Sequence, residues 1–104
     1  MMDSIGLTRT LDEIASERAA LGELWLDKNQ PGWDQRIDEA TLNMEHAQLC
    51  VLGQVYEDYW WAPQEARAHS EEWGFSCDFL YSKSGVTYGH LDRAWLAVLA
   101  ARKL

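Results

Sequence analysis

The sequence predicts one compact, mainly α-helical domain of four helices, with an irregular or short extended segment before the last helix. Two observations predict this fold class. Apolar residues recur three and four positions apart in four separate stretches, which is the period of one face of an α-helix. Capping residues, proline or glycine mark where these stretches begin and end. We expect the helices at about residues 10–27, 44–61, 63–73 and 87–102.

The first helix has a clear start. Thr10 is followed three residues later by Glu13, the spacing of a capping box in which each side chain bonds the other residue's backbone N–H. Leu21 and Leu24 continue an apolar stripe at helical spacing. The helix is expected to end before the turn at Pro31-Gly32.

The connector and the second helix follow. Trp33 and Ile37 lie four apart, so one short helical turn would place both under the core. Asn43 is the expected N-cap of the second helix, and Leu52 belongs to its apolar face. Glycine inside a helix costs about 1 kcal/mol relative to alanine. Gly53 therefore predicts the close approach of another helix backbone.

Proline and glycine also delimit the third helix. Pro63 ends the second helix and suits the first position of the third. Gly74 fits the residue just past its C-terminus, with Phe75 folding back as the hydrophobic contact. Residues 76–86 are ambiguous between loop and short extended segment, and Thr87 caps the last helix.

Length and composition predict a single domain spanning residues 1–104, with 1–9 as a loose N-terminal segment. The 47% hydrophobic content is normal for a globular protein, and six tryptophans supply large apolar side chains for a small core. The expected core draws on the connector and all four helices: Leu21, Leu24, Trp33, Leu52, Tyr56, Trp73, Trp95 and Val98.

The charge balance restricts the class of partner. A formal net charge of −8 disfavours direct binding of nucleic acid, which needs a surplus of lysine and arginine, and disfavours anionic membrane surfaces. Residues 79–104 are locally basic, with four bases against the single acid Asp92. We expect the last helix to pack beside acidic neighbours. A protein partner fits this balance better than either of the excluded classes, and a basic protein is one candidate.

Cysteine usage and hydropathy predict the compartment. The two cysteines do not make a disulfide framework, and Met1–Ser4 lacks the basic and apolar regions of a signal peptide. No apolar run reaches the roughly 20 residues needed to span a bilayer. A cytoplasmic protein with reduced thiols is expected.

The candidate catalytic and metal-binding residues are few. His46 and Cys50 lie four apart on the expected second helix, with Glu57 near the same side, so both could face one ion. The other histidines and Cys77 lie in other segments, and the paired spacing of a zinc site is absent. Phosphate loops, dinucleotide-binding glycines and nucleophile elbows are absent too. We expect no cofactor, no metal, no catalytic residue and a buried Cys50.

Trp61 is the residue that points most directly to a binding surface. At roughly 100° per residue, a continuous helix would place it about 180° from Leu52, opposite the apolar face. Two outcomes remain open: the indole packs in the corner before Pro63, or it faces solvent. An exposed tryptophan flanked by acids would anchor a partner. The acids concerned are Glu57, Asp58 and Glu65.

Several motifs carry a family resemblance. They are Trp25-Leu26-Asp27, Pro31-Gly32-Trp33, Cys50-Val51-Leu52-Gly53-Gln54, Gly74-Phe75 and Leu91 followed by Trp95. Together they resemble a group of small uncharacterised proteins of actinobacterial phages and their hosts, over roughly residues 20–100. The resemblance implies a bacterial host cytoplasm as the setting. It implies no activity.

Three functions follow from this reading. The first is a small, acidic, non-catalytic domain that binds and modulates a host or phage protein. The second is a nucleic-acid mimic that inhibits a DNA-binding protein, since carboxylates can imitate phosphates. The third, and the least favoured, is a small metal-binding or enzymatic domain.

Overall fold

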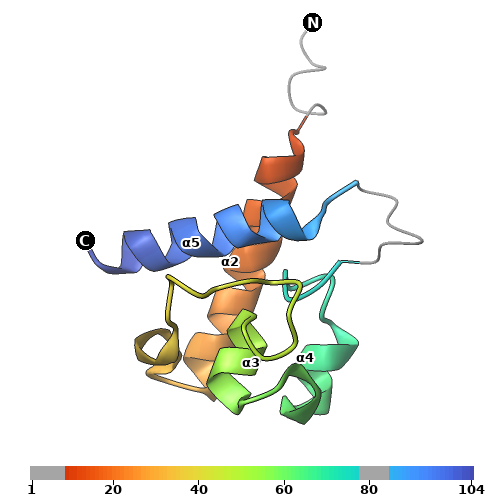
Figure 1. Ribbon diagram of the computed structural model, residues 1–104. Coiled ribbons are helices and arrows are strands. Elements are labelled where there is room, and N and C mark those ends of the chain that lie inside the picture. The colour runs from red at the N-terminus through yellow and green to blue at the C-terminus, as the bar shows by residue number, and fades with distance from the viewer. Residues whose placement is uncertain (1–8, 78–84) are drawn as a thin grey trace, which may run out of the picture.

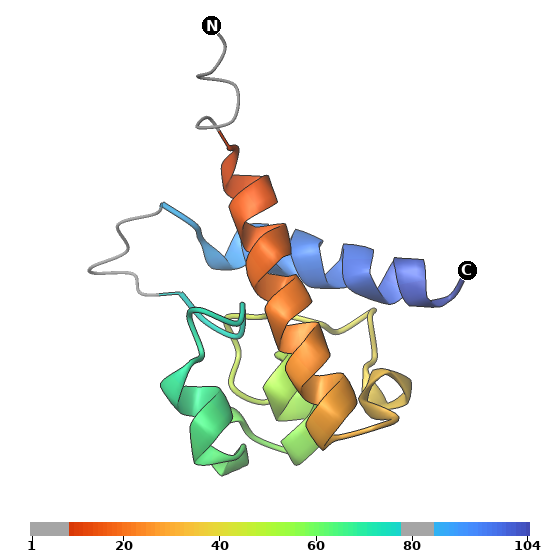
Figure 2. The ribbon, with the colours of Figure 1, turned by 180° about the vertical axis from the view of Figure 1, so that it is seen from behind.

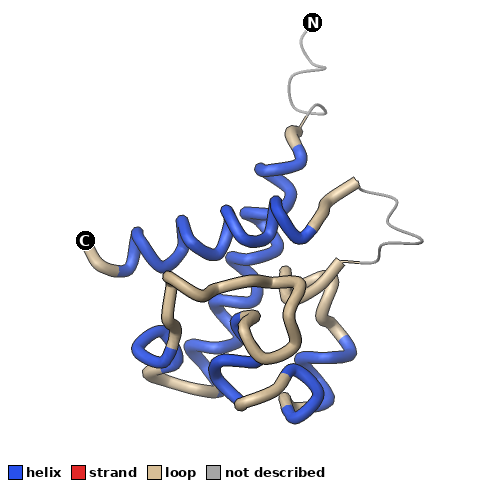
Figure 3. The backbone as a smooth tube through the Cα atoms, viewed as in Figure 1, coloured by secondary structure: helices blue, strands red, loops and turns tan. Residues whose placement is uncertain are grey.

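The computed structural model describes residues 9–77 and 85–104. Helices account for all the regular structure in these two ranges, which confirms the mainly α-helical fold class (Figures 1 and 3). The described helices are α2 (Leu11–Asn29), η1 (Trp33–Arg36), α3 (Val51–Tyr56), η2 (Tyr59–Trp61), α4 (Gln64–Ala68) and α5 (Tyr88–Arg102). None of these described helices is both long and apolar enough to cross a bilayer.

Two long helices organise the domain. α2 and α5 cross, and theirs is the most extensive contact between any two described elements. Figures 1 and 2 show the short elements between them gathered on one side of α5, around the C-terminal part of α2, while the N-terminal part of α2 extends beyond the crossing. The shorter elements therefore depend on this crossing for their position.

The predicted helix starts are confirmed for both long helices. The Glu13 amide donates to Thr10 Oγ1 at 3.0 Å, and the Thr10 amide donates to Glu13 Oε1 at 2.8 Å. Thr87 caps α5 in the same way, with His90 as the reciprocal partner. These signals are local in sequence, which is why they can be recognised without the fold.

The inner face of α2 differs from the predicted one. Ala15, Ala19 and Gly22 are buried, whereas Leu21 and Leu24 are 47% and 66% exposed. These small side chains let the backbone of another segment approach α2 closely. A Cβ added at Gly22 would collide with the carbonyl oxygen of Trp73. The prediction that Leu21 and Leu24 lie on the inner face was wrong, because it followed the spacing of leucines and did not count alanine and glycine as inner-face residues.

Trp95 is at the centre of the core. Its side chain is fully buried, and its indole N–H donates to the Gly74 carbonyl at 2.7 Å. The ring stacks on Phe75 at 5.6 Å between centroids and meets Trp33 edge to face at 5.8 Å. Of the eight residues predicted for the core, Trp33, Leu52 and Trp95 are buried, Tyr56, Trp73 and Val98 are partly buried against it, and Leu21 and Leu24 are exposed.

The predicted second helix, 44–61, was wrong in extent. Only Val51–Tyr56 is α-helical, and its N-cap is Cys50, whose sulfur accepts from the Gly53 amide at 3.2 Å, instead of Asn43. Glu57 adopts a left-handed conformation (φ 77°) and ends the helix. The predicted close approach to Gly53 is present, but it comes from the loop backbone at 47–48 and not from another helix.

The predicted third helix, 63–73, is also shorter. α4 ends at Ala68 and turns continue to Trp73, because the Ser70 amide bonds the Arg67 carbonyl three residues back. Pro63 is the N-cap residue of α4 and not its first helical residue, so the helix begins one position later than expected. Gly74 is left-handed (φ 75°), but it ends the run of turns and does not directly follow the helix, because the C-cap of α4 is His69. The region before α5 is irregular at 76–77 and 85–86, while residues 78–84, like 1–8, lie outside the described ranges.

Arg102 joins three elements. Its guanidinium donates to Glu23 at 2.7 Å, to Asp27 at 2.9 Å and to Asp34 at 3.0 Å, and it lies 5.1 Å from the ring centroid of Trp33. Burial alone would raise the pKa of Asp27, but hydrogen bonds from Arg102 and Trp33 outweigh it and lower that pKa from 3.8. This cluster confirms that the last helix packs beside acidic neighbours.

Replacing Trp95 by alanine should destabilise the domain by about 3–5 kcal/mol, since it removes a large buried aromatic and leaves the Gly74 carbonyl unsatisfied. Urea unfolding followed by circular dichroism measures the loss. Leu96→Ala, at the half-exposed next position, is the control and should cost under about 1 kcal/mol. Equal losses for the two variants would show that Trp95 is not the centre of the core.

Arg102→Gln should cost about 2 kcal/mol at pH 7, because three carboxylates lose a shared, partly buried partner. Arg93→Gln removes the exposed pair with Asp12 and should cost under about 0.5 kcal/mol. The pKa of Asp27 is lowered by folding, so its contribution is present above 3.8 and is lost as pH falls through the folded value. Unfolding curves at pH 7 and pH 3 should therefore show the Arg102→Gln deficit shrinking; a deficit unchanged by pH would refute the ionic origin.

Candidate functional site

Two adjacent tryptophans project from η2. Trp60 is 67% exposed and Trp61 is 69% exposed. The turn that carries them is fixed at its start: Asp58 Oδ1 accepts from the Trp60 amide at 2.9 Å, and the Tyr59 amide donates to the Ala47 carbonyl at 2.7 Å. Of the two outcomes left open for Trp61, the structure has the solvent-facing one. The cause is not the predicted helix position, because the helix ends at Tyr56.

The acids predicted to surround Trp61 have separate roles. Glu57 is exposed and occupies the left-handed position between α3 and η2. Asp58 caps η2 with one carboxylate oxygen. Glu65, in α4, accepts the indole N–H of Trp25 at 2.7 Å and so ties α4 to α2. Glu57 and Asp58 thus lie close to the tryptophan pair in the chain, with Tyr59 between, whereas Glu65 has a structural partner of its own.

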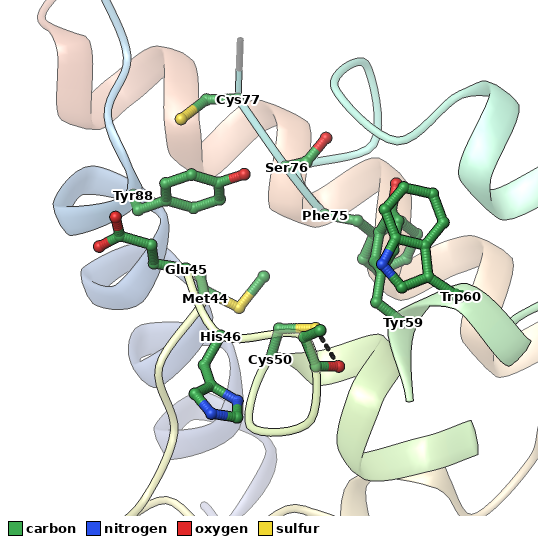
Figure 4. Close-up of a pocket in the computed structure, with 11 residues that line it drawn as sticks. Met44, Glu45, His46, Cys50, Tyr59, Trp60, Phe75, Ser76, Cys77 and Tyr88 are labelled. Atoms are coloured by element: carbon green, nitrogen blue, oxygen red, sulfur yellow. Dashed lines mark hydrogen bonds between the residues drawn. The ribbon is translucent and has the colours of Figure 1, made fainter. Parts of the chain in front are cut away.

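A pocket of about 350 Å³ lies beside Trp60, and we call it the Trp60 pocket (Figure 4). It is formed where the loop before α3, η2, residues 75–77 and the start of α5 meet. Its aromatic lining consists of Tyr59, Trp60, Phe75 and Tyr88, and its sulfur-containing lining of Met44, Cys50 and Cys77. Its polar lining includes Glu45, His46 and Ser76. Sequence reasoning missed this pocket, since four separate segments contribute to it.

Hydrogen bonds hold one wall of the pocket. The Tyr59 hydroxyl donates to Ser70 Oγ at 2.9 Å, and Ser70 Oγ donates to Ser76 Oγ at 2.7 Å. Ser70 is buried, so this chain fixes the wall from behind. On the opposite side, Figure 4 shows the Tyr88 ring with its hydroxyl directed toward the middle of the pocket. Burial raises the pKa of Tyr88, so its hydroxyl keeps its proton at neutral pH.

The thiol of Cys50 is poorly suited to catalysis. It is buried, as predicted, and burial raises its pKa above the ordinary value of 9.0. The reactive species of a cysteine is the thiolate, which is scarce at neutral pH when the pKa is high. The sulfur already accepts from the Gly53 amide and donates to the Ala47 carbonyl at 3.7 Å. Cys50 therefore acts as a cap for α3.

His46 and Cys50 line the same pocket although the helix expected to align them is absent at these positions, and the fold adds Cys77. His46 Nδ1 accepts the Gln48 amide at 3.1 Å, so that nitrogen is engaged with the backbone. Within residues 9–77 and 85–104, histidines, cysteines and acids do not come together in groups of three or more that could hold a metal ion. The described lining thus consists mainly of aromatic and sulfur-containing side chains, together with a few polar ones.

Cys50→Ala should destabilise the domain by about 1 kcal/mol relative to Cys50→Ser, because serine can still accept from the Gly53 amide and alanine cannot. Urea unfolding of both variants measures this difference. In the folded wild type, Cys50 should also react with a thiol reagent far more slowly than in urea, as read by peptide mass spectrometry. An alanine variant as stable as the serine variant would exclude a capping role.

The motif residues of the resemblance have structural roles. Asp27 accepts the indole N–H of Trp33 at 2.9 Å, and Cys50 caps the helix that contains Gly53. These contacts give the motif residues a structural role in this chain, and the phage relationship stays a prediction. Comparison of the chain with models of protein families, with curated proteins and with solved structures gives no match.

Proposed function

We propose that this chain is a non-catalytic protein-binding domain, of the kind that phages use to modulate a host or phage protein, and that it contacts its partner through Trp60 and Trp61. The observation that carries the proposal is the exposure of both indoles, at 67% and 69%. Large apolar side chains left in water are unfavourable unless a partner covers them. Tryptophan is also among the residues most enriched at binding hot spots.

The tryptophan pair is held ready for binding. Tyr59 packs against the core, and its ring meets Trp60 edge to face at 5.0 Å with an interplanar angle of 88°. The turn itself is fixed by two hydrogen bonds, in which the Asp58 carboxylate accepts from the Trp60 amide and the Ala47 carbonyl accepts from the Tyr59 amide. A preorganised surface loses less conformational entropy on association, so more of the contact energy appears as affinity.

The charge around the pair favours a basic partner. Glu57 and Asp58 precede the tryptophans with Tyr59 between, in a chain of net charge −8. Acids at the rim of an interface steer an oppositely charged protein and make the association rate sensitive to salt. The same charge disfavours direct contact with nucleic acid.

The alternatives receive less support. A nucleic-acid mimic needs free surface carboxylates, yet Glu23, Asp27 and Asp34 converge on Arg102. A cysteine enzyme needs a reactive thiolate, and burial raises the pKa of Cys50. Neither alternative accounts for the exposure of Trp60 and Trp61, which the protein-binding proposal explains directly.

Trp61→Ala should weaken partner binding by about 2 kcal/mol or more, in the hot-spot range, and leave the melting temperature nearly unchanged. The partner is identified by quantitative capture from host lysate, and affinity is then measured with the purified protein by biolayer interferometry. Leu24→Ala is the matched control, because Leu24 is comparably exposed (66%) but belongs to α2. Raising salt should slow association of the wild type.

Two results would contradict the proposal. One is that the wild type, Trp61→Ala and a Trp60→Ala variant all capture the same proteins from the lysate. The other is a melting temperature lowered by more than a few degrees in Trp61→Ala with affinity intact, which would make Trp61 a packing residue.

A further inference from the structure

We propose that the Trp60 pocket receives an organic cation, namely the guanidinium group of an arginine on the partner protein. The inference rests on the proposed function for the source of the cation. The pocket and the exposed tryptophan pair share Trp60, which lines the first and belongs to the second. A protein that covers the tryptophan pair is therefore placed to insert a side chain into the pocket.

The walls have the chemistry that binds a cation. Four aromatic rings line the pocket, and two of them, Tyr59 and Trp60, stand nearly perpendicular to each other. The faces of aromatic rings are negative and attract arginine, lysine and other cations, most strongly at tryptophan. A planar guanidinium can also stack on such a face, which an ammonium cannot.

The charges on the pocket select against anions. Lysine and arginine are absent from the described lining, whereas Glu45 contributes a carboxylate. In Figure 4, Glu45 and Tyr88 stand on one side of the pocket and Trp60 and Tyr59 on the other. A cation between Tyr88 and Trp60 would have aromatic surface on both sides. The Glu45 carboxylate points away from the middle of the pocket in this view, and a different rotamer of this exposed side chain would bring it to the cation. A hydrogen bond from a guanidinium to a carboxylate is among the stronger ones in proteins.

Size and depth fit one side chain. About 350 Å³ is at the small end of the range for ligand pockets, too small for an extended segment. Phe75, at 1% exposure, forms the deep part, and Trp60, at 67%, forms the rim. The sulfurs of Met44 and Cys50 add polarizable apolar surface that suits the methylene stem of an arginine.

The test uses small probes that do not require the partner. N-acetylarginine amide is titrated into isotopically labelled protein at constant ionic strength, and its neutral isostere N-acetylcitrulline amide is titrated in parallel, with backbone NMR shifts as the readout. The arginine probe should bind at least about fivefold more tightly and shift the amides of Glu45, Cys50 and Ser76. Equal affinity of the two probes would overturn the inference, since it would leave only apolar contact.

Variants separate this inference from the proposed function. Trp60→Ala and Glu45→Gln should each weaken the arginine probe several-fold, with folding checked by thermal melts, whereas the citrulline probe should be indifferent to Glu45→Gln. Trp61→Ala is the matched control: Trp61 is not part of the lining, so probe affinity should be unchanged even when partner capture is lost. Probe binding that is insensitive to Trp60→Ala would place the cation elsewhere and refute the site.

A third probe tests the source of the cation. Tetramethylammonium carries the charge without a side-chain stem. If it binds tightly while the arginine probe does not, the pocket takes a free alkylammonium compound and the partner-arginine inference is wrong. If the arginine probe binds more tightly, the stem and the planar guanidinium contribute as proposed.

Discussion

The burial of Trp95 beneath the crossing of α2 and α5 is the contact on which the rest of the structure depends. One indole touches two separated parts of the chain: it stacks on Phe75 and donates to the carbonyl of the adjacent Gly74, and it meets Trp33 edge to face. Close packing of this kind transmits position, because neighbouring groups cannot shift independently. The hydrogen bond to Gly74 sets where residues 75–77 run, and these residues form one wall of the Trp60 pocket.

The opposite wall depends on a backbone contact at Gly53. Without a Cβ at that position, the chain at 47–48 folds back against α3 and places Cys50 where its sulfur can cap the helix. The same loop is tied to the last helix, since the Met44 amide donates to Asp92 Oδ1 at 2.7 Å. Met44 and Cys50 thus reach the pocket through a loop fixed at both ends. A regular helix from residue 44 would have removed both the loop and the pocket.

How much of this could be predicted depends on whether a signal is local. Signals within a few residues of sequence predict the caps at Thr10 and Thr87 and a left-handed turn at Gly74, and the structure has all three. The inner face of α2 could not be predicted from apolarity, because Gly22 is buried by its tertiary contacts and not by its own hydrophobicity. A thiol cap has no strong sequence signature, so the start of α3 was missed. The pocket needs four segments at once. For Trp61 both packing and exposure stayed open, and the helix geometry used to weigh them is absent because α3 ends at Tyr56.

The distribution of charge connects the fold to its surface. Arg93, Arg102 and Lys103 of the basic C-terminal part pair with acids of α2, η1 and the connector. Arg102 and Lys103 offset part of the negative charge of the acids that they contact in α2, η1 and the connector. Residues 44–72 have Arg67 as their single lysine or arginine against six acids, and this stretch carries both the tryptophan pair and much of the pocket lining. Most of the net negative charge therefore lies in the stretch that carries the aromatic surface. Apolar exposure and negative potential on the same surface favour one class of partner, a protein that presents basic side chains around an apolar contact.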